Sequence, residues 1–270
     1  MLAAMLVGVE RNRPRAHLLV GLMIAGALGL TSCTGDPAGP TSTSTAPRTT
    51  SVYASSSASS SVAQSTSNTA GYRPGVIRRA GSIGNARYDV SVPQVSGGNP
   101  RIAALFNQSA TAVSHDFVSG LAKSRAVTTI QDSDLGSTES TRVATITDRV
   151  IAGVSIYLWY TKGTAHPNFG LSTVVVDVAR ARPIQRDELF SDPAGAKSRL
   201  AQLAAAHDRT GRLSRSLSIA TVPEWVPTVD GLRVYISVSH AAGDFVPVTI
   251  PWSEIRSEIA PDLHETLGAE

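Results

Sequence analysis

Between Thr34 and Ala70 the chain has almost no large apolar side chains, and 19 of these 37 residues are Ser or Thr. Such a segment cannot bury enough apolar surface to offset the chain entropy lost on folding, so we predict a disordered tether. We therefore expect the folded domain to lie in the residues that follow the tether. We therefore divide the 270 residues into a leader over 1–32, a tether over 33–71 and one folded domain over 72–267.

The segment before the tether has the organisation of a signal peptide. Arg11, Arg13 and Arg15 precede Leu18–Leu30, an apolar run without charge. A helix over these 13 residues is about 20 Å long, whereas the hydrocarbon core of a bilayer is about 30 Å thick. The run is therefore predicted to be the hydrophobic part of a cleaved leader over 1–32 rather than a membrane span.

The only cysteine of the chain, Cys33, directly follows this leader. The sequence Leu30-Thr31-Ser32-Cys33 resembles the bacterial lipobox, in which an apolar residue and two small residues precede the acceptor cysteine. Cleavage between Ser32 and Cys33 would free an amino group for acylation, for example by palmitate, while the sulfur carries diacylglycerol, and two or more chains anchor stably. We expect an extracytoplasmic protein anchored to the cell membrane through Cys33. The alternative is an ordinary secreted protein with an unrelated cysteine.

Composition excludes several other classes of protein. A single cysteine cannot form a disulfide framework or a zinc site built on several thiolates. The formal net charge is +3, and the charged residues before Cys33 contribute +2 of it. The remaining balance of +1 gives no support for a nucleic-acid partner.

The part of the chain after the tether mixes strand-like and helix-like patterns. Alternating or β-branched stretches predict strands over Arg87–Val92 (ended by Pro93), Val143–Asp148, Val154–Tyr160, Leu171–Val178, Trp225–Val226, Leu232–Val238 and Phe245–Ile250. We expect a hairpin across Gly153, a turn over 163–168 and a hairpin turn at Asp230-Gly231.

Helix signals lie between these strands. Asn99-Pro100 predicts a helix start, and apolar residues recur every three or four positions after it, at Ile102, Phe106, Ala110, Val113, Phe117 and Leu121. We also expect a short helical turn over 187–190, a second long helix over Ala194–Arg209 and a terminal helix from Pro251. The order of the elements predicts an α+β fold, a mostly antiparallel sheet packed by two longer helices and a C-terminal helix.

Four segments of the predicted domain, in this order, resemble a known family. They are Tyr160–Pro167, Pro183–Phe190, Val229–Tyr235 and Val248–Ile255. Together they are similar to the domain shared by the extracytoplasmic part of the sigma-V anti-sigma factor RsiV and the secreted mycobacterial immunogenic proteins. The resemblance covers about Arg87 to Ile259 and implies an extracytoplasmic α+β module used for recognition. The RsiV domain binds lysozyme, and related domains accompany peptidoglycan-modifying enzymes.

The sequence also departs from that family. Relatives often have a tyrosine-containing stretch where this chain has Ser239–Gly243, and some have a disulfide that a single cysteine cannot form. No cytoplasmic anti-sigma segment precedes the leader, so we do not expect the signalling role to transfer.

His166 and Thr164, in the glycine-containing turn over 163–168, are the candidate binding or turn residues. A nucleophilic triad would need a serine and an acid beside His166. The candidates are Ser155, Ser172, Asp148 and Asp177. The interpretation we favour is that His166 and Thr164 form hydrogen bonds with backbone groups and fix the turn. We assign no catalytic residue.

Other polar clusters have simple structural interpretations. His166, His207 and His240 lack the spacing of metal ligands, so we expect no metal and no cofactor. Asp187 and Glu188 point about 100° apart on a helical turn and are interpreted as acids at a helix N-terminus. The aromatic residues Tyr157, Trp159 and Tyr160 are interpreted as core rather than as a sugar-stacking surface. The arginines Arg199, Arg209, Arg212 and Arg215 are interpreted as a solvated face.

These observations predict a cell-envelope lipoprotein with a non-catalytic domain that binds an envelope protein or a cell-wall ligand. The membrane lipid would be contacted through acylated Cys33. The alternatives are a cell-wall-directed hydrolase with an unrecognised active site, and a surface spacer without a specific ligand.

Overall fold

The computed structural model describes residues 70–136, 139–214 and 216–269. The predicted leader, Ser32, Cys33 and all of the predicted tether except Ala70 and Gly71 lie outside these residues. Within the described part, no helix is both long enough and apolar enough to cross a membrane.

A seven-stranded sheet forms the first half of the fold, in the order β1-β2-β3-β5-β6-β7, with β4 also paired to β5. The strands are β1 (Tyr72–Ile83), β2 (Ala86–Gly97), β3 (Thr128–Asp132), β4 (Arg142–Ile146), β5 (Val150–Thr161), β6 (Asn168–Asp177) and β7 (Arg182–Pro183). Only the β2–β3 pair is parallel among the described strands, and the connection between these two strands contains the long helix α1 (Pro100–Leu121). The predicted α+β class with a mostly antiparallel sheet is confirmed.

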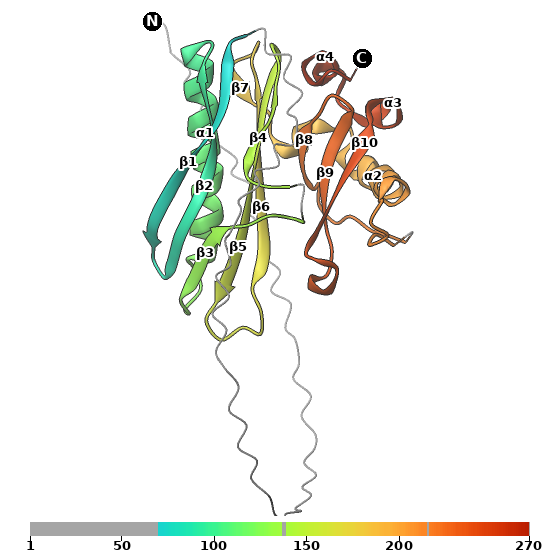
Figure 1. The fold of residues 1–270 in the computed structure, drawn as a ribbon. Coiled ribbons are helices and arrows are strands. Elements are labelled where there is room, and N and C mark those ends of the chain that lie inside the picture. Colours follow the sequence, from blue (N-terminus) through green and yellow to red (C-terminus); the bar gives the residue numbers. More distant parts are fainter. Residues whose placement is uncertain (1–69, 137–138, 215, 270) are drawn as a thin grey trace, which may run out of the picture. The chain divides into compact units, whose positions relative to one another are not determined.

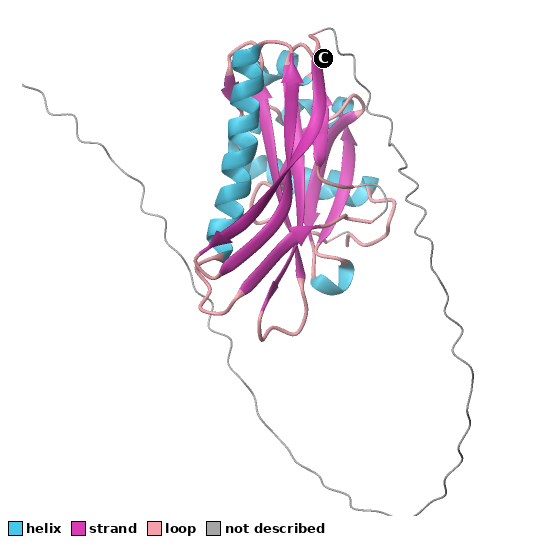
Figure 2. Cartoon of the chain, turned by 60° about the vertical axis from the view of Figure 1, so that its left-hand side comes forward, coloured by secondary structure: helices cyan, strands magenta, loops and turns pink. Residues whose placement is uncertain are grey.

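The start of α1 follows directly from the sequence. The Asn99 side chain accepts hydrogen bonds from the backbone N–H groups of Arg101 and Ile102, at 2.9 and 3.4 Å. Pro100 takes the first helical position, where no backbone N–H is needed. Ile102 and Phe106 are buried, so α1 packs its apolar stripe on one face of the sheet (Figure 2).

A second, three-stranded sheet lies on the other side of the larger sheet (Figure 1). Its strands are β8 (Glu224–Pro227), β9 (Gly231–Ser237) and β10 (Phe245–Pro251), paired antiparallel in the order β10-β9-β8. The predicted Asp230-Gly231 turn joins β8 to β9. Gly231 has φ +155°, and a Cβ at this position would lie 2.0 Å from the Ile250 carbonyl oxygen, so only glycine fits.

The helices of this second half are mostly short. They are η1 (Arg186–Leu189), α2 (Pro193–His207), η2 (His240–Ala242), α3 (Trp252–Ile255), η3 (Arg256–Glu258), η4 (Pro261–Leu263) and α4 (His264–Leu267). The predicted helical turn near 187–190 and the helix after Pro193 are confirmed. The single terminal helix predicted from Pro251 is divided into α3, η3, η4 and α4.

Strand β5 shows how the layers share one core. Val150, Ala152 and Val154 point toward the three-stranded sheet, whereas Ile151 and Tyr157 point toward α1. Both faces of β5 are therefore covered, which explains why its first eight residues are all buried.

Charged side chains also join the two sheets. Buried Glu139 accepts hydrogen bonds from Arg142 Nη1 at 2.9 Å and from the Tyr235 hydroxyl at 3.0 Å, and it forms an ion pair with Arg233. Burial, followed by the Glu139 charge, raises the pKa of Tyr235 above its usual value. The tyrosine hydroxyl thus stays protonated and donates.

Two predicted strand boundaries are wrong. Strand β2 does not end at Pro93 but continues to Gly97. The backbone N–H groups of Ser91 and Val95 donate to the side chains of Asp132 and Asn107. The backbone hydrogen-bonding groups of odd-numbered β2 residues therefore point away from β1. On that side no described strand pairs with β2 beyond Asp89, and a proline costs no ladder hydrogen bond there.

The hairpin predicted across Gly153 lies instead at 147–150, where Thr147 N–H donates to the Val150 carbonyl. Gly153 is inside β5, and a Cβ there would come within 3.0 Å of Phe106 and Pro93. Its role is close packing rather than turning. Strands β1, β3 and β7 had no counterpart among the predicted elements.

Candidate binding site at the free edge of β6

Strand β6 has a partner along only part of one side. It pairs with β5 from Asn168 to Asp177, but with β7 only at Val176 and Asp177. Ile184 N–H still donates to the Val175 carbonyl at 2.8 Å, and the chain then turns away into η1. Backbone groups of alternate residues point to opposite sides of an antiparallel strand. Those of Phe169, Leu171 and Thr173 therefore face an edge that no described strand covers.

Two carboxylates from the second half of the chain take N–H groups on this edge. Asp244 Oδ2 accepts from Phe169 N–H at 2.8 Å. Glu224 Oε2 accepts from Thr173 N–H at 3.1 Å and from its hydroxyl at 2.6 Å. Each carboxylate takes the place that the carbonyl of a neighbouring strand would have, so the N–H groups of Phe169 and Thr173 are satisfied without a strand.

A cavity of about 460 Å³ opens beside Thr173 and Val174, a volume within the usual range for ligand pockets, roughly 300–1,000 Å³. Helix α1 supplies one wall, and the chain from Pro183 into η1 supplies another. The lining includes Ser109, Ala112, Val113, Arg186, Asp187 and Glu224. The cavity thus has apolar walls and a charged rim.

The rim charges are arranged around Arg186. Its Nη1 donates to Glu224 Oε1 at 3.0 Å, and its Nε lies 3.7 Å from Asp187 Oδ1. One cation and two carboxylates line the cavity, giving a balance of −1 (one positive minus two negative). Asp187 has 74% of its side chain exposed, whereas Glu224 has 24%.

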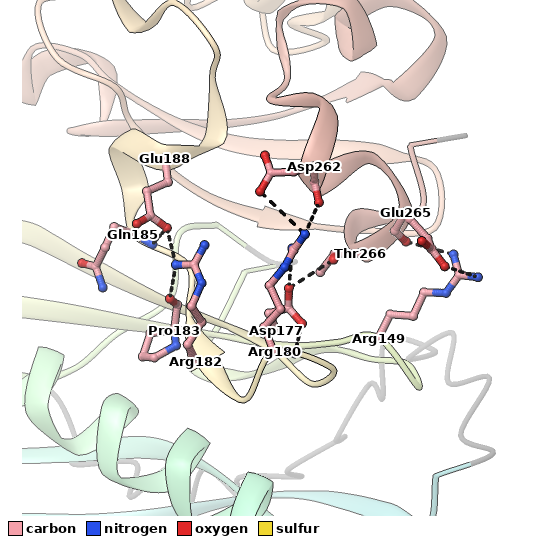
Figure 3. Close-up of polar contacts among 10 residues, drawn as sticks. All are labelled: Arg149, Asp177, Arg180, Arg182, Pro183, Gln185, Glu188, Asp262, Glu265 and Thr266. Atoms are coloured by element: carbon pink, nitrogen blue, oxygen red, sulfur yellow. Dashed lines mark hydrogen bonds and ion pairs between the residues drawn. The ribbon is translucent and has the colours of Figure 1, made fainter.

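The rim is positioned by the start of η1. Glu188 Oε2 accepts from Gln185 N–H at 3.2 Å and from Arg182 Nη1 at 2.6 Å (Figure 3). The Arg182 hydrogen bond holds the pKa of Glu188 below its usual value. Glu188 therefore caps the turn as predicted, while Asp187 remains at the cavity.

The turn at His166 lies at one end of the β5–β6 hairpin. Thr164 Oγ1 donates to the carbonyls of Thr161 and His166, at 2.8 and 3.3 Å. His166 Nδ1 lies 3.0 Å from the Pro167 carbonyl oxygen, so it is the protonated nitrogen that donates. These are the kind of backbone hydrogen bonds that the turn interpretation requires.

His166 also has a partner that its sequence position did not suggest. Its ring stacks on that of His240, with centroids 3.7 Å apart and planes 6° apart. His240 Nδ1 lies 3.1 and 3.2 Å from the two carboxylate oxygens of Asp244. Lone pairs in two parallel rings do not converge on one ion, and no group of three metal-ligating side chains occurs among the described residues. His207 lies elsewhere, with Glu254 at 3.0 Å.

The triad considered around His166 is not assembled. Val150 pairs with Asp177 and Trp159 with Asn168, so Asp148 and Asp177 lie at the opposite end of the hairpin from His166. Nine residue steps along a strand separate the two ends by about 30 Å. Ser155 is paired with Ser172 in the middle of the hairpin, and Ser172 is hydrogen-bonded to the Tyr157 hydroxyl at 3.2 Å.

The remaining sequence candidates have structural roles. Tyr157 is buried and stacks on Phe117 with centroids 4.4 Å apart, as the core interpretation predicts. The core interpretation is wrong for Tyr160, which is exposed. Arg212 donates to the Ala242 carbonyl at 2.9 Å. Arg215 lies outside the described residues. The three charged residues at the β6 edge, Arg186, Glu224 and Asp244, were not singled out for this site by any sequence pattern.

No protein-family model matches the sequence, and no curated protein matches it. Among solved structures, the chain is similar to a member of the DUF3298 family from Bacteroides fragilis, with 13% identity, a TM-score of 0.44, and coverage of 74% of this chain and 99% of that one. It is also similar to a DUF3298 family protein from Pseudomonas aeruginosa, with 14% identity, a TM-score of 0.41, and coverage of 71% and 95%.

Proposed function

We propose that this chain is an extracytoplasmic lipoprotein whose folded part is an RsiV-like, non-catalytic binding domain for an envelope protein or a cell-wall ligand. The observation that carries the binding role is the cavity at the β6 edge. Two of its charged lining residues are already held by hydrogen bonds: Glu224 accepts from Thr173 and Arg186, and the Arg186 carbonyl accepts from Trp225 Nε1 at 3.3 Å. Groups held in this way form a preorganised recognition surface.

The anchor is supported by the Leu30–Cys33 sequence and its place after the apolar run. The test is to express the wild type and Cys33→Ala with labelled palmitate and to separate membrane from soluble fractions. We expect the wild type to take up label and sediment with membranes, and Cys33→Ala to do neither. A Cys33→Ala protein that stays in the membrane, together with an unlabelled wild type, would contradict the anchor.

The binding role is tested by affinity capture from an envelope extract with the full chain in a non-ionic detergent. Ala112 is exposed on α1 and lines the cavity, whereas Ala104 is exposed on α1 and does not line it. We expect Ala112→Trp, which fills the cavity, to lose the captured partner and the matched control Ala104→Trp to retain it. Equal capture by both variants would show that the partner does not bind at the cavity.

A hydrolase is the second candidate, and one observation favours it. Asp244 orients His240 through Nδ1, as an acid orients the general base in nucleophilic hydrolases. Among the described residues, His240 has no hydroxyl group as a hydrogen-bond partner. Hydrolysis of muropeptides or simple esters should be compared between wild type, His166→Ala and His240→Ala. Activity in the wild type that either variant loses while remaining folded would establish the hydrolase instead.

A further inference from the structure

The free edge of β6 lies where β7 would pair with β6 if β7 were longer. Strand β7 pairs Arg182 with Asp177 and Pro183 with Val176, and Ile184 N–H reaches the Val175 carbonyl. The next position in this antiparallel line lies opposite Val174, and there the chain leaves at Gln185. The line itself goes on past Thr173, Leu171 and Phe169, whose backbone groups repeat about every 6.8 Å along the edge.

An extended chain on this line would begin beside the charged rim. Running antiparallel to β6, in the direction of β7, its first residue would lie opposite Thr173. Its amino terminus would then lie next to Glu224 and Asp187, where the lining charges sum to −1. A free ammonium group complements this charge, and Glu224 is already hydrogen-bonded to Thr173.

The walls fit the side chains of such a chain. Odd-numbered residues opposite Thr173 and Leu171 would point toward the three-stranded sheet, and even-numbered residues toward α1. On the α1 side the wall contains Ala112 and Val113, which favour an apolar side chain at the second residue.

We propose that the free edge of β6 binds the amino-terminal end of an extended peptide, which continues β7 and places its ammonium group beside Glu224 and Asp187. This proposal rests on the binding role above and names its ligand class. The first peptide carbonyl takes the Thr173 N–H from Glu224, which then pairs with the ammonium group and Arg186. Main-chain hydrogen bonds supply the affinity, as in other strand-addition complexes.

The test is fluorescence anisotropy with the full chain in non-ionic detergent and the pentapeptide Thr-Val-Thr-Val-Thr, carrying fluorescein at its C-terminus. We expect saturable binding. Acetylation of the amino terminus should weaken it about two- to fivefold, the usual value of a partly exposed charge pair. Ala112→Trp should abolish binding and Ala104→Trp should not.

N-methylated peptides separate strand addition from simple charge attraction. The N–H of the third residue would face β6 and donate to the Leu171 carbonyl, whereas that of the fourth residue would face away. We expect N-methylation at the third residue to weaken binding about tenfold and N-methylation at the fourth to leave it nearly unchanged. Asp187→Asn, at an exposed side chain, should reduce the advantage of the free amine over the acetylated peptide.

Three results would overturn the proposal: no saturable binding of the free peptide, equal binding of the two N-methylated peptides, or equal binding of the acetylated and free peptides. In the first case the two carboxylates serve only to protect the sheet edge from aggregation. The proposed function would survive these results if an envelope partner were still captured through the cavity and if Cys33 were still acylated.

Discussion

The two ends of β6 are both held by an aspartate, but the two aspartates differ in burial. At the Phe169 end, Asp244 comes from a loop of the second sheet, has 12% of its side chain exposed and lies beside two stacked histidines. At the other end, Asp177 belongs to β6 itself and is fully buried. Glu224, between them, is more exposed than either. The edge of β6 is therefore fixed firmly at Asp177 and more loosely beside the cavity, where Glu224 binds Thr173.

The firm end joins the C-terminal segment to the sheet (Figure 3). Asp177 accepts from Arg180 N–H at 2.8 Å, from Arg180 Nη1 at 2.9 Å and from the Thr266 hydroxyl at 3.2 Å. Arg180 Nη2 in turn donates to the Asp262 carbonyl at 2.9 Å, and Arg149 Nη1 donates to the Glu265 carbonyl at 3.0 Å. Loss of Asp177 therefore loosens several segments together.

The largest effect is expected for Asp177→Ala. The substitution removes a charged acceptor from three hydrogen bonds and leaves the buried Thr266 hydroxyl without it, so it should lower the free energy of unfolding by about 2–4 kcal/mol. Urea denaturation followed by circular dichroism measures the loss. Asp116→Ala is the control, because Asp116 has 84% of its side chain exposed and should change stability by less than about 0.5 kcal/mol. Similar losses of stability in the two variants would show that Asp177 does not fix its end of β6 firmly.

Glu224→Ala should have the next largest effect. It leaves Thr173 N–H and Arg186 without their acceptor, but water reaches this site, so we expect a loss of about 1–3 kcal/mol. Glu224→Gln retains an acceptor oxygen and should lose less. A Glu224→Ala loss larger than that of Asp177→Ala, in the same urea titrations, would show that the cavity side is the firm one.

Sequence reasoning recovers the elements whose signals are local. Helix α1 follows from Asn99-Pro100 and the spacing of its apolar residues, and the β8–β9 hairpin follows from Asp230-Gly231. Strand β1 has no such signal, because Arg73–Ser82 is exposed throughout and contains three arginines. It is a strand because β2 offers it a complete row of backbone hydrogen bonds, and this partner is visible only in the fold.

The same limit applies to the candidate site. His166 could be singled out because it lies in a turn with its own glycine, but its partner His240 is 74 residues away in the sequence. Glu224 and Asp244 act on β6 from 51 and 75 residues away. Their role depends on an edge left free when β7 stops, which is a property of the folded sheet and not of any short sequence pattern.

Asp244 tests the Phe169 end of β6. This residue has φ +62°, a conformation that Asn and Asp tolerate better than other residues with a Cβ. Asp244→Asn retains both this tolerance and an acceptor for Phe169 N–H, so we expect a loss below about 1 kcal/mol. Asp244→Ala lacks both and should lose about 1–2 kcal/mol. Thermal unfolding of the two variants measures the difference, and equal losses would show that neither backbone strain nor the Phe169 bond matters there.

The turn that follows Asp177, between β6 and β7, contains a strained residue. Ala181 has φ +49°, which an L-residue with a Cβ adopts at a cost that glycine avoids. Ala181→Gly should therefore raise the free energy of unfolding by up to about 1 kcal/mol, although part of the gain is offset by the greater entropy of glycine in the unfolded chain. A loss of stability in urea would show that the turn is not strained.

The smallest effect is expected where the rim of the cavity begins, at Glu188. The Arg182 hydrogen bond lowers the pKa of this carboxyl in the folded state. Its contribution is therefore present above the unfolded pKa, about 4.3, and is lost as the pH falls through the lower folded value. Because 43% of the Glu188 side chain is exposed, Glu188→Gln should cost only a few tenths of a kcal/mol at pH 7. The difference between wild type and variant should shrink below about pH 4, as measured by urea midpoints at both pH values. A difference that stays constant with pH would show that the charge of Glu188 does not hold η1 in place, and that the neutral hydrogen bond to Gln185 N–H is sufficient.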